Sequence, residues 1–168
     1  MAHKFPIAMK AELDCPQRKK LFNPHKNLTS LGVMSSMVVA DIGCGTGFFT
    51  IPLASIVGPK GKVFAVDISK VMISDIKKRV EKEGLRNVKA VLSRENKAPL
   101  KSKKLDYCLL ASVVHELENK VLFFKELKRL VKNGGKIGII EWKKIPSSVG
   151  PPFKERIPIA ALRQMLVK

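Results

Sequence analysis

Short apolar runs alternate along the chain with segments whose apolar residues recur at helical spacing. The runs are rich in branched side chains and have the length of strands buried in a parallel sheet. We predict such strands at residues 37–41, 62–67, 87–92, 105–111 and 136–142. The segments beside them predict helices at residues 24–31, 48–57, 69–83, 118–132 and 157–167. Strands that alternate with helices predict an α/β fold, in which helices cover both faces of a mainly parallel sheet.

The chain length of 168 residues fits a single domain. Residues 1–22 are basic and interrupted by Pro6 and Pro16, so we expect an N-terminal arm with one short helical stretch. Residues 23–168 are expected to form the domain itself. Ligands of such sheets bind beyond the carboxyl ends of the strands, and the arm is a candidate lid over that site.

Composition excludes several classes of protein. Apolar residues make up 45% of the chain, but no apolar run approaches the roughly 18 residues of a membrane span. The first residues lack the apolar region of a secretory signal. Three widely spaced cysteines (Cys15, Cys44 and Cys108) fit neither a disulfide framework nor a zinc knuckle. We expect a reduced, cytoplasmic compartment and no metal site.

The charge of the chain is strongly unbalanced. Lys and Arg number 32 against 14 Asp and Glu, which gives a net charge of +18. Such a balance favours a polyanionic partner such as nucleic acid. The lysines are nevertheless spread over the whole chain, and aromatic residues are only 6%, so a base-stacking surface is poorly supplied. A solvated lysine-rich surface and a functional anion-binding face both remain open.

A glycine-rich loop follows the first predicted strand, in the sequence Asp41-Ile-Gly43-Cys-Gly45-Thr-Gly47. Glycine permits a tight turn and lets a ligand lie directly against main-chain N–H groups. The helix after the loop offers free N–H donors that suit a carboxylate. We therefore interpret the loop as a ligand site rather than as a turn that only packs a helix on a strand.

A second acidic residue, Asp67, ends the second predicted strand. Its carboxylate could accept hydrogen bonds from both hydroxyls of a ribose. Dinucleotide-binding enzymes use an acid at this place too, but their glycines follow the pattern GxGxxG, and here the pattern is GxGxG. Asp41 beside the loop would repel a pyrophosphate and would suit a ligand with an ammonium group. A nicotinamide-dependent dehydrogenase is thus a distant alternative.

These residues resemble those of a known family. The segment Asp41–Gly47 resembles motif I of class I S-adenosylmethionine (SAM)-dependent methyltransferases, and Val63–Asp67 is similar to the ribose-binding strand of that family. Leu105–Leu117 resembles the fourth-strand motif, and Leu130–Glu141 the helix–Gly-Gly–strand segment after it. The resemblance covers roughly residues 23–142, and within the family it is to the ubiquinone/menaquinone-biosynthesis-type enzymes. It implies SAM as the cofactor and S-adenosylhomocysteine (SAH) as its product.

The resemblance also implies contacts for the methionine end of SAM. Gly43, Gly45 and Gly47 would line the methionine tail. Asp41 would face its amino group, directly or through water. Ala111, at the end of the fourth strand, would lie near the sulfonium.

At the adenosine end, Asp67 would hold the ribose hydroxyls and Ile68 would pack on the adenine. The family commonly has an acid near the adenine amino group, after the third strand. In this sequence Arg94 stands where we would align that acid. We therefore expect Glu95 or Asn96 to make the contact, or the contact to be lost.

Methyl transfer from a sulfonium requires in-line alignment more than it requires catalytic groups. A general base helps only if the acceptor carries a proton that must leave. His115 follows the fourth strand and faces the ligand side of the sheet, so it is the candidate base or substrate contact. The alternative is a histidine that caps the next helix or packs beneath a loop.

The family pattern adds two further strands after the last helix, and this sequence has no counterpart of them. We expect a Rossmann-like three-layer sandwich with five parallel strands in the order 3-2-1-4-5. The fifth strand would then be an edge with an apolar face, which invites pairing. This feature has three interpretations: the last helix covers the fifth strand, a second subunit pairs with it in a homodimer, or the protein is a truncated relative with weakened activity.

Our prediction is a SAM-dependent methyltransferase that acts on a small-molecule acceptor. An RNA or ribosomal-protein methyltransferase is an alternative because of the charge. A non-catalytic SAM-binding or interaction module is another, because of the missing strands.

Overall fold

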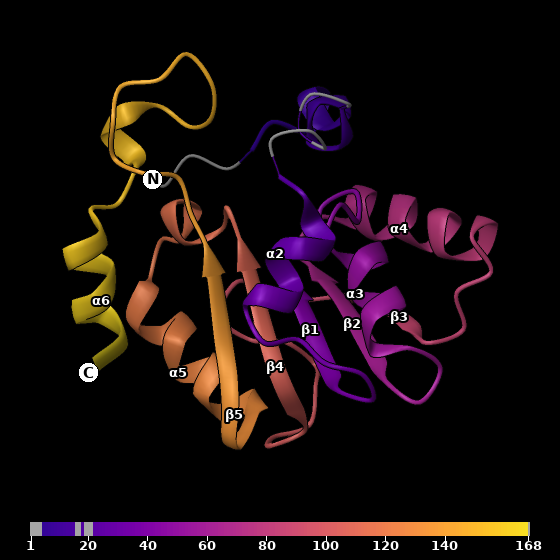
Figure 1. The fold of residues 1–168 in the computed structure, drawn as a ribbon. Coiled ribbons are helices and arrows are strands. Elements are labelled where there is room, and N and C mark those ends of the chain that lie inside the picture. Colours follow the sequence, from indigo (N-terminus) through magenta and orange to yellow (C-terminus); the bar gives the residue numbers. More distant parts are fainter. Residues whose placement is uncertain (1–4, 16–17, 19–21, 168) are drawn as a thin grey trace.

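The structure is a computed structural model that describes residues 5–15, 18 and 22–167. Within these residues the chain forms one five-stranded sheet in the order β3-β2-β1-β4-β5, and every neighbouring pair is parallel (Figure 1). The fold class and strand order predicted from the sequence are confirmed. The strands are β1 (Val38–Ile42), β2 (Lys62–Asp67), β3 (Val88–Leu92), β4 (Leu105–Ala111) and β5 (Val131–Ile140).

Helices connect the strands, and side-chain caps fix where several of them begin. Asn23, Ser69 and Asn119 each accept a hydrogen bond from the backbone N–H three residues ahead, as N-cap residues do. The α-helices are α2 (Pro24–Ser30), α3 (Thr50–Val57), α4 (Lys70–Lys82), α5 (Lys120–Leu130) and α6 (Ile159–Val167). Three short 3₁₀ helices are η1 (Ile7–Asp14), η2 (Val114–Glu116) and η3 (Phe153–Glu155). No helix among the described residues has both the length and the apolar character needed to cross a bilayer.

The two faces of the sheet are buried by different helices. Alternate strand residues such as Val39, Val63 and Leu109 pack with α2 and α3 on one face, and α4 adds a smaller core beside them. Residues of opposite parity, such as Ala40 and Leu110, pack with α5 and α6 on the other face. Because both faces are covered, the inner strands β1 and β4 are mainly apolar, which is why the sequence shows runs rather than strict alternation.

The fifth strand differs from its prediction. We expected a helix to residue 132 and a strand only from residue 136, because Gly134 and Gly135 signal a stop. In the structure α5 ends at Leu130, and β5 begins at once, with Val131 opposite Leu105. The next ladder pair is Tyr107 with Lys136, so the strand bulges between them. The two glycines therefore lie within an irregular strand rather than before a regular one.

Candidate functional site

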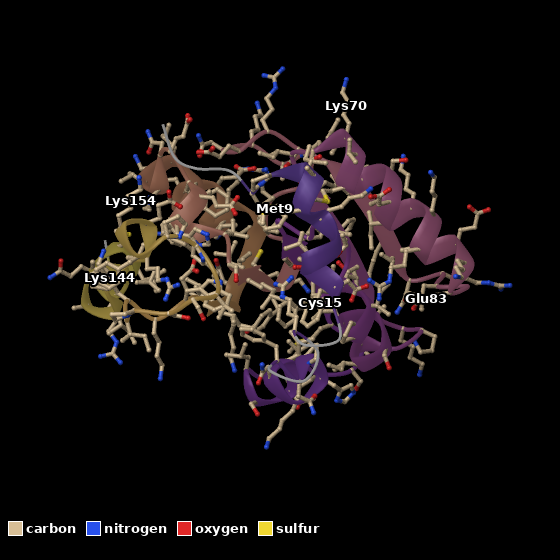
Figure 2. All side chains as sticks on the ribbon, turned by 90° about the horizontal axis from the view of Figure 1, so that it is seen from above. Met9, Cys15, Lys70, Glu83, Lys144 and Lys154 are labelled. Carbon is tan, nitrogen blue, oxygen red and sulfur yellow. The ribbon has the colours of Figure 1, made fainter. Side chains whose placement is uncertain are left out.

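A cavity of about 1030 Å³ lies at the carboxyl ends of the strands. The loops after β1, β2 and β4 form its floor, as expected for a parallel sheet. The 3₁₀ helix η1 and residues 149–152 of the C-terminal loop also contribute to its walls. In Figure 2 the segment with Met9 and Cys15 lies between α4 and the loop that carries Lys144 and Lys154. The N-terminal arm, predicted as a lid, thus borders the cavity.

Two of the three motif glycines line the cavity, and each has a positive φ. A Cβ on Gly43 would lie 2.5 Å from Val113 Cγ2, and one on Gly45 would lie 3.3 Å from Leu13 of η1. Gly47 does not line the cavity; a Cβ there would collide with Ile76 of α4. The contact of Gly47 with the methionine tail stays a prediction. In the structure, the missing Cβ of this glycine lets α4 pack closely behind the loop.

Asp41 lies at the base of the glycine loop and is 2% exposed. The hydroxyl of Thr50 donates a 2.6 Å hydrogen bond to its Oδ2. Burial raises the pKa of the Asp41 carboxyl to about 6, although this hydrogen bond and the charge of Arg18 oppose the shift. A buried carboxylate with a single short hydrogen bond retains capacity for a cationic ligand.

Asp67 is held rigidly at the end of β2. Its two carboxylate oxygens accept backbone N–H groups, Oδ2 from Gly45 at 3.0 Å and Oδ1 from Ser69 at 2.8 Å. Burial raises its pKa, and these hydrogen bonds oppose the rise. A carboxylate has about four acceptor positions, so acceptor capacity remains for a diol. Asp67 also faces the cavity, and it is in a suitable place for the ribose contact that we expected.

Three of the four remaining predicted cofactor residues line the cavity, and Asn96 does not. Ile68 (43% exposed), Glu95 and Ala111 line the cavity. One oxygen of Glu95 already accepts the backbone N–H groups of residues 118 and 119, at 3.0 and 3.3 Å. Asn96 is absent from the cavity wall, and its buried Oδ1 has no hydrogen-bond partner among the described residues. Of the two alternatives for the adenine contact, the structure places only Glu95 at the cavity.

His115 lies in η2, and the chain reaches it through a strained turn: Ser112 has a φ of 59°. The His115 Nδ1 lies 2.9 Å from Glu141 Oε1, and the two side chains are 6% and 7% exposed. Burial alone would lower the pKa of His115, but Glu141, with Glu116 and Glu155, outweighs it and raises the pKa. His115 lines the cavity, so the histidine is neither a helix cap nor wholly enclosed beneath a loop.

The N-terminal arm is fastened over the glycine loop by two ion pairs with α4. Lys10 Nζ lies 2.6 Å from Asp75, and Arg79 Nη1 lies 2.8 Å from Asp14. Arg79 also donates to the carbonyl of Thr46, inside the loop. These contacts hold η1 over the cavity.

Arg18 is a cavity residue that the sequence did not single out. Its guanidinium stacks 4.5 Å above the ring of Phe48 and donates to the carbonyl of Leu13. Burial lowers its pKa, while Cys15, Asp14 and Asp41 oppose the shift. A partly desolvated cation beside the glycine loop is suited to a ligand carboxylate.

The C-terminal loop forms an apolar part of the cavity wall, and a buried arginine holds the loop together through hydrogen bonds to its carbonyls. Arg156, 3% exposed, donates to the carbonyls of Ile145, Val149 and Pro151 at 2.7, 2.7 and 2.9 Å. The ring of Trp142 packs against this loop, where a Cβ on Gly150 would overlap it. The indole also meets Phe22 edge-on, with ring centroids 5.9 Å apart.

Comparison with known proteins identifies the family. The profile of a family described as a methyltransferase domain matches residues 34–154, well over half of the chain. The chain belongs to the methyltransferase domain family. The resemblance to class I methyltransferases seen in the motifs is thus confirmed. The match covers the glycine loop, Asp67 and His115, and it excludes the N-terminal arm.

This methyltransferase domain is also similar to solved structures. It is 38% identical to a SAM-dependent methyltransferase from Aquifex aeolicus, with a TM-score of 0.94, over 98% of this chain and 87% of that one. A putative SAM-dependent methyltransferase from Methanococcus maripaludis shares the fold, at 24% identity and a TM-score of 0.68, over 83% of this chain and 65% of that one.

Among curated proteins, the methyltransferase domain is 31% identical to a demethylmenaquinone methyltransferase from Geobacillus sp. (strain WCH70). That match extends over 120 residues, which are 71% of this chain and 51% of the relative. The chain therefore spans about half the length of the curated relatives it matches.

Sequence reasoning missed three residues of the site: Arg18, Glu141 and Trp142. Arg18 lies in a basic segment without a motif, and nothing local distinguishes it from the neighbouring lysines. Glu141 and Trp142 lie at the end of the strand predicted at residues 136–142, so Glu141 could have been treated like Asp41 and Asp67, the acids at the ends of the first two strands. The pairing of Glu141 with His115 depends on β4 and β5 being neighbours, which the predicted strand order already contained.

Proposed function

We propose that this chain binds SAM at the glycine loop and transfers its methyl group to a small-molecule acceptor. The observation that carries the proposal is the convergence of Asp41, Gly43, Gly45 and Asp67 at one end of a single cavity. SAM supplies an electrophilic methyl group on a sulfonium. The family to which the chain belongs and its similarity to a SAM-dependent methyltransferase support this assignment.

The donor set fits each part of the cofactor. Asp67, fixed by two backbone N–H groups, keeps free acceptor positions for the ribose hydroxyls. Asp41 offers a buried negative charge to the amino group, and Arg18 offers a cation to the carboxylate. The missing Cβ atoms of Gly43 and Gly45 leave their main chain open to the cavity. Ile68 provides an exposed apolar surface for the adenine.

The charge of the cavity favours a small molecule over a polyanion. Among the described residues, its lining contains four acids (Asp41, Asp67, Glu95 and Glu116) and two permanent cations, Arg18 and Lys70. This balance is opposite to the net charge of +18. An RNA substrate would need cations around the reacting atoms to neutralise its phosphates. Curated relatives named demethylmenaquinone methyltransferase likewise favour a small acceptor.

His115 is the proposed catalytic base for an acceptor that loses a proton. Glu141 orients its Nδ1, and the ring lines the cavity beyond Ala111, near the place assigned to the sulfonium. A hydrogen-bonded, partly buried imidazole is suited to take up a proton near neutral pH.

Calorimetric titration with SAM, SAH and NAD tests this function. We expect SAM and SAH to bind with micromolar dissociation constants and NAD not to bind. Asp67→Ala should weaken both adenosyl ligands by at least tenfold. The control is Glu81→Ala, which removes an exposed acid of α4 outside the cavity lining. Absence of SAM binding to the wild type, or equal binding of NAD, would overturn the assignment.

A further inference from the structure

His115 and Glu141 form a buried pair whose two partners come from different strands. Glu141 follows β5, and both of its oxygens face the turn after β4: Oε1 accepts from the His115 ring, and Oε2 lies 3.4 Å from the His115 backbone N. The Trp142 backbone N–H also donates to Oε1, at 2.9 Å. Glu141 is thus fixed by three contacts, and it can hold the imidazole in one orientation.

The arrangement leaves one ring nitrogen of His115 for a ligand. Nδ1 is committed to Glu141, so the neutral ring carries its proton there and presents a lone pair at Nε2. Glu116 Oε1 lies 3.8 Å from Nε2, beyond hydrogen-bond distance. The Glu116 carboxylate is itself engaged by the backbone N–H of Phe5. Nε2 is therefore the free basic atom of this pair.

Glu116, Glu141 and Glu155 act on the charge of this ring, and the residue after Glu141 is an aromatic residue of the cavity wall. The backbone of Trp142 contacts Glu141, and the rings of Trp142 and Phe22 form an edge-on pair in the cavity wall. The two cations of the lining lie elsewhere. Arg18 stacks on Phe48, and Lys70 begins α4, on the far side of η1 from the C-terminal loop (Figure 2). The Arg156 guanidinium lies 5.7 Å from the Trp142 ring, but it is buried and donates to three backbone carbonyls. Among the described lining residues, no cation of this part of the cavity is open to a carboxylate or phosphate of the acceptor.

We propose that the acceptor is an uncharged aromatic molecule with a phenolic hydroxyl, that this hydroxyl binds His115 Nε2, and that Glu141 is the positioning residue of the pair. The inference rests on the proposed methyl-transfer function and specifies its second substrate.

The methyl group is transferred from sulfur to oxygen in one displacement. The phenolic oxygen attacks the methyl carbon, so the oxygen–carbon bond forms while the carbon–sulfur bond breaks and its electron pair stays on sulfur. The phenolic proton passes to His115 Nε2. The resulting imidazolium is stabilised by Glu141, and its proton leaves to solvent after the methyl ether and SAH depart.

The acidity of the acceptor decides between classes of hydroxyl. A phenol has a pKa of about 10, as in tyrosine, whereas an aliphatic hydroxyl ionises near that of water, at about 16. Only the phenol lies within reach of an imidazole base. The aromatic wall further favours a ring as the body of the acceptor.

The chromophore 4-nitrophenol tests this pairing without any turnover, because its ionised form absorbs at a longer wavelength than its neutral form. The probe is titrated with pH in the presence of excess protein, with and without SAH. We expect the pKa of the bound probe to fall by at least one unit, a tenfold change, because the imidazolium pairs with the phenolate. Glu141, Glu116 and Glu155 raise the pKa of His115 and so favour the imidazolium that forms when the bound probe ionises.

Three variants separate the roles. His115→Asn keeps an amide N–H near the former Nδ1 and so keeps Glu141 paired, but it removes the base; the shift should vanish or reverse. Glu141→Gln should keep less than half of the shift, because the imidazolium loses its stabilising charge. Glu81→Gln, on the exposed face of α4, is the matched control and should match the wild type. SAH affinity and melting temperature are measured for each variant.

The outcomes are distinct. A wild type that does not bind 4-nitrophenol, or that binds it without a shift, overturns the acceptor class. A shift that survives His115→Asn overturns the role of His115, and one unchanged in Glu141→Gln overturns the positioning role. Failure of SAH to bind, in the same samples, counts against the proposed function instead. Binding of SAH together with the expected pattern of shifts supports both.

Discussion

At the scale of single residues, the site places an ionisable group where the folded protein disfavours its charge. Asp41 is buried, and in the absence of ligand its main compensation is one hydroxyl. The folded state therefore holds the proton of Asp41 more tightly than the unfolded chain does. The stability that this gives is present at low pH and is lost as pH rises from the ordinary pKa of 3.8 to about 6.

We predict that Asp41→Asn stabilises the unliganded protein at pH 7.5. The amide keeps an acceptor for Thr50 and carries no charge, so the gain should be roughly 1–3 kcal/mol from the size of the pKa shift. Urea unfolding at pH 7.5 and at pH 4 measures it, and the difference between variant and wild type should nearly vanish at pH 4. Equal destabilisation at both pH values would contradict this account.

The same carboxyl should make SAM binding depend on pH. An ammonium group binds the ionised form of Asp41, so SAM affinity should increase as pH rises through about 6 and level off above it. Calorimetry between pH 5 and pH 8 checks the curve. In Asp41→Asn the affinity should be lower by at least tenfold at pH 7.5, and the rise near pH 6 should be lost.

A second prediction at this scale concerns Gly47, where the structure leaves no space for a side chain. Gly47→Ala combines a φ of +91° with a collision against Ile76, and it should cost more than about 2 kcal/mol. Gly84→Ala has a φ of +63° and open space around it, so it should cost only about 1 kcal/mol. Chemical denaturation of both variants separates backbone strain from packing. Equal losses would show that Ile76 moves aside.

At the scale of elements, the N-terminal 3₁₀ helix η1 depends on α4 for its position. Its two ion pairs are only partly exposed, and Arg79 also reaches the glycine loop. The arm therefore joins two parts of the site, the loop beneath it and the helix beside it.

We predict that Arg79→Ala releases η1 without unfolding the domain. Hydrogen exchange in residues 7–14 should become at least several times faster, and bound SAH should dissociate faster. The global stability should fall by less than about 1 kcal/mol, because the lost contacts are near the surface. Arg86→Ala, an exposed arginine close by, is the control. Unchanged exchange in η1 would show that apolar contacts alone hold it.

The elements also show what the sequence could and could not predict. β2 and β4 occupy the predicted residues, because their composition and flanking turns agree. The start of β5 was missed, because the bulge opposite Leu105 depends on a partner strand that is distant in sequence. Asp41 and Asp67 could be found because they belong to local motifs. Arg18 could not, because its place in the cavity is created by tertiary contacts. The pairing of His115 with Glu141 follows from the predicted strand order only if an acid at the end of β5 is considered, and no local motif indicates that acid.

At the scale of the whole molecule, the sheet has lysines along its outer strands. Lys89 on β3 and Lys132 and Lys136 on β5 are exposed. Charged side chains on outer strands oppose edge-to-edge pairing. Helix α6 packs with α5 beside β5, and Leu162 joins the core of that face. Helix α6 thus packs on α5, and both cover of the fifth strand by this helix and a homodimer stay predictions.

The contrast between a basic molecule and an acidic cavity leads to a kinetic prediction. SAM carries one net positive charge and SAH carries none, so the field of a protein with a net charge of +18 repels SAM at long range. Raising the salt concentration from about 20 mM to about 300 mM should speed SAM association several-fold while leaving SAH nearly unchanged. Stopped-flow binding measures both rates. A decrease for SAM would show that the acidic cavity, not the net charge, controls its approach.

The single tryptophan of the chain has a further consequence. Trp142 lies in the cavity wall that we assign to the acceptor, not in the glycine loop that we assign to the cofactor. The guanidinium of Arg156 is 5.7 Å from its ring. Indole emission depends on nearby charge and on exposure to water. The molecule thus contains its own optical reporter, which senses the acceptor wall rather than the cofactor loop. A library of unlabelled aromatic compounds could be screened by this emission alone.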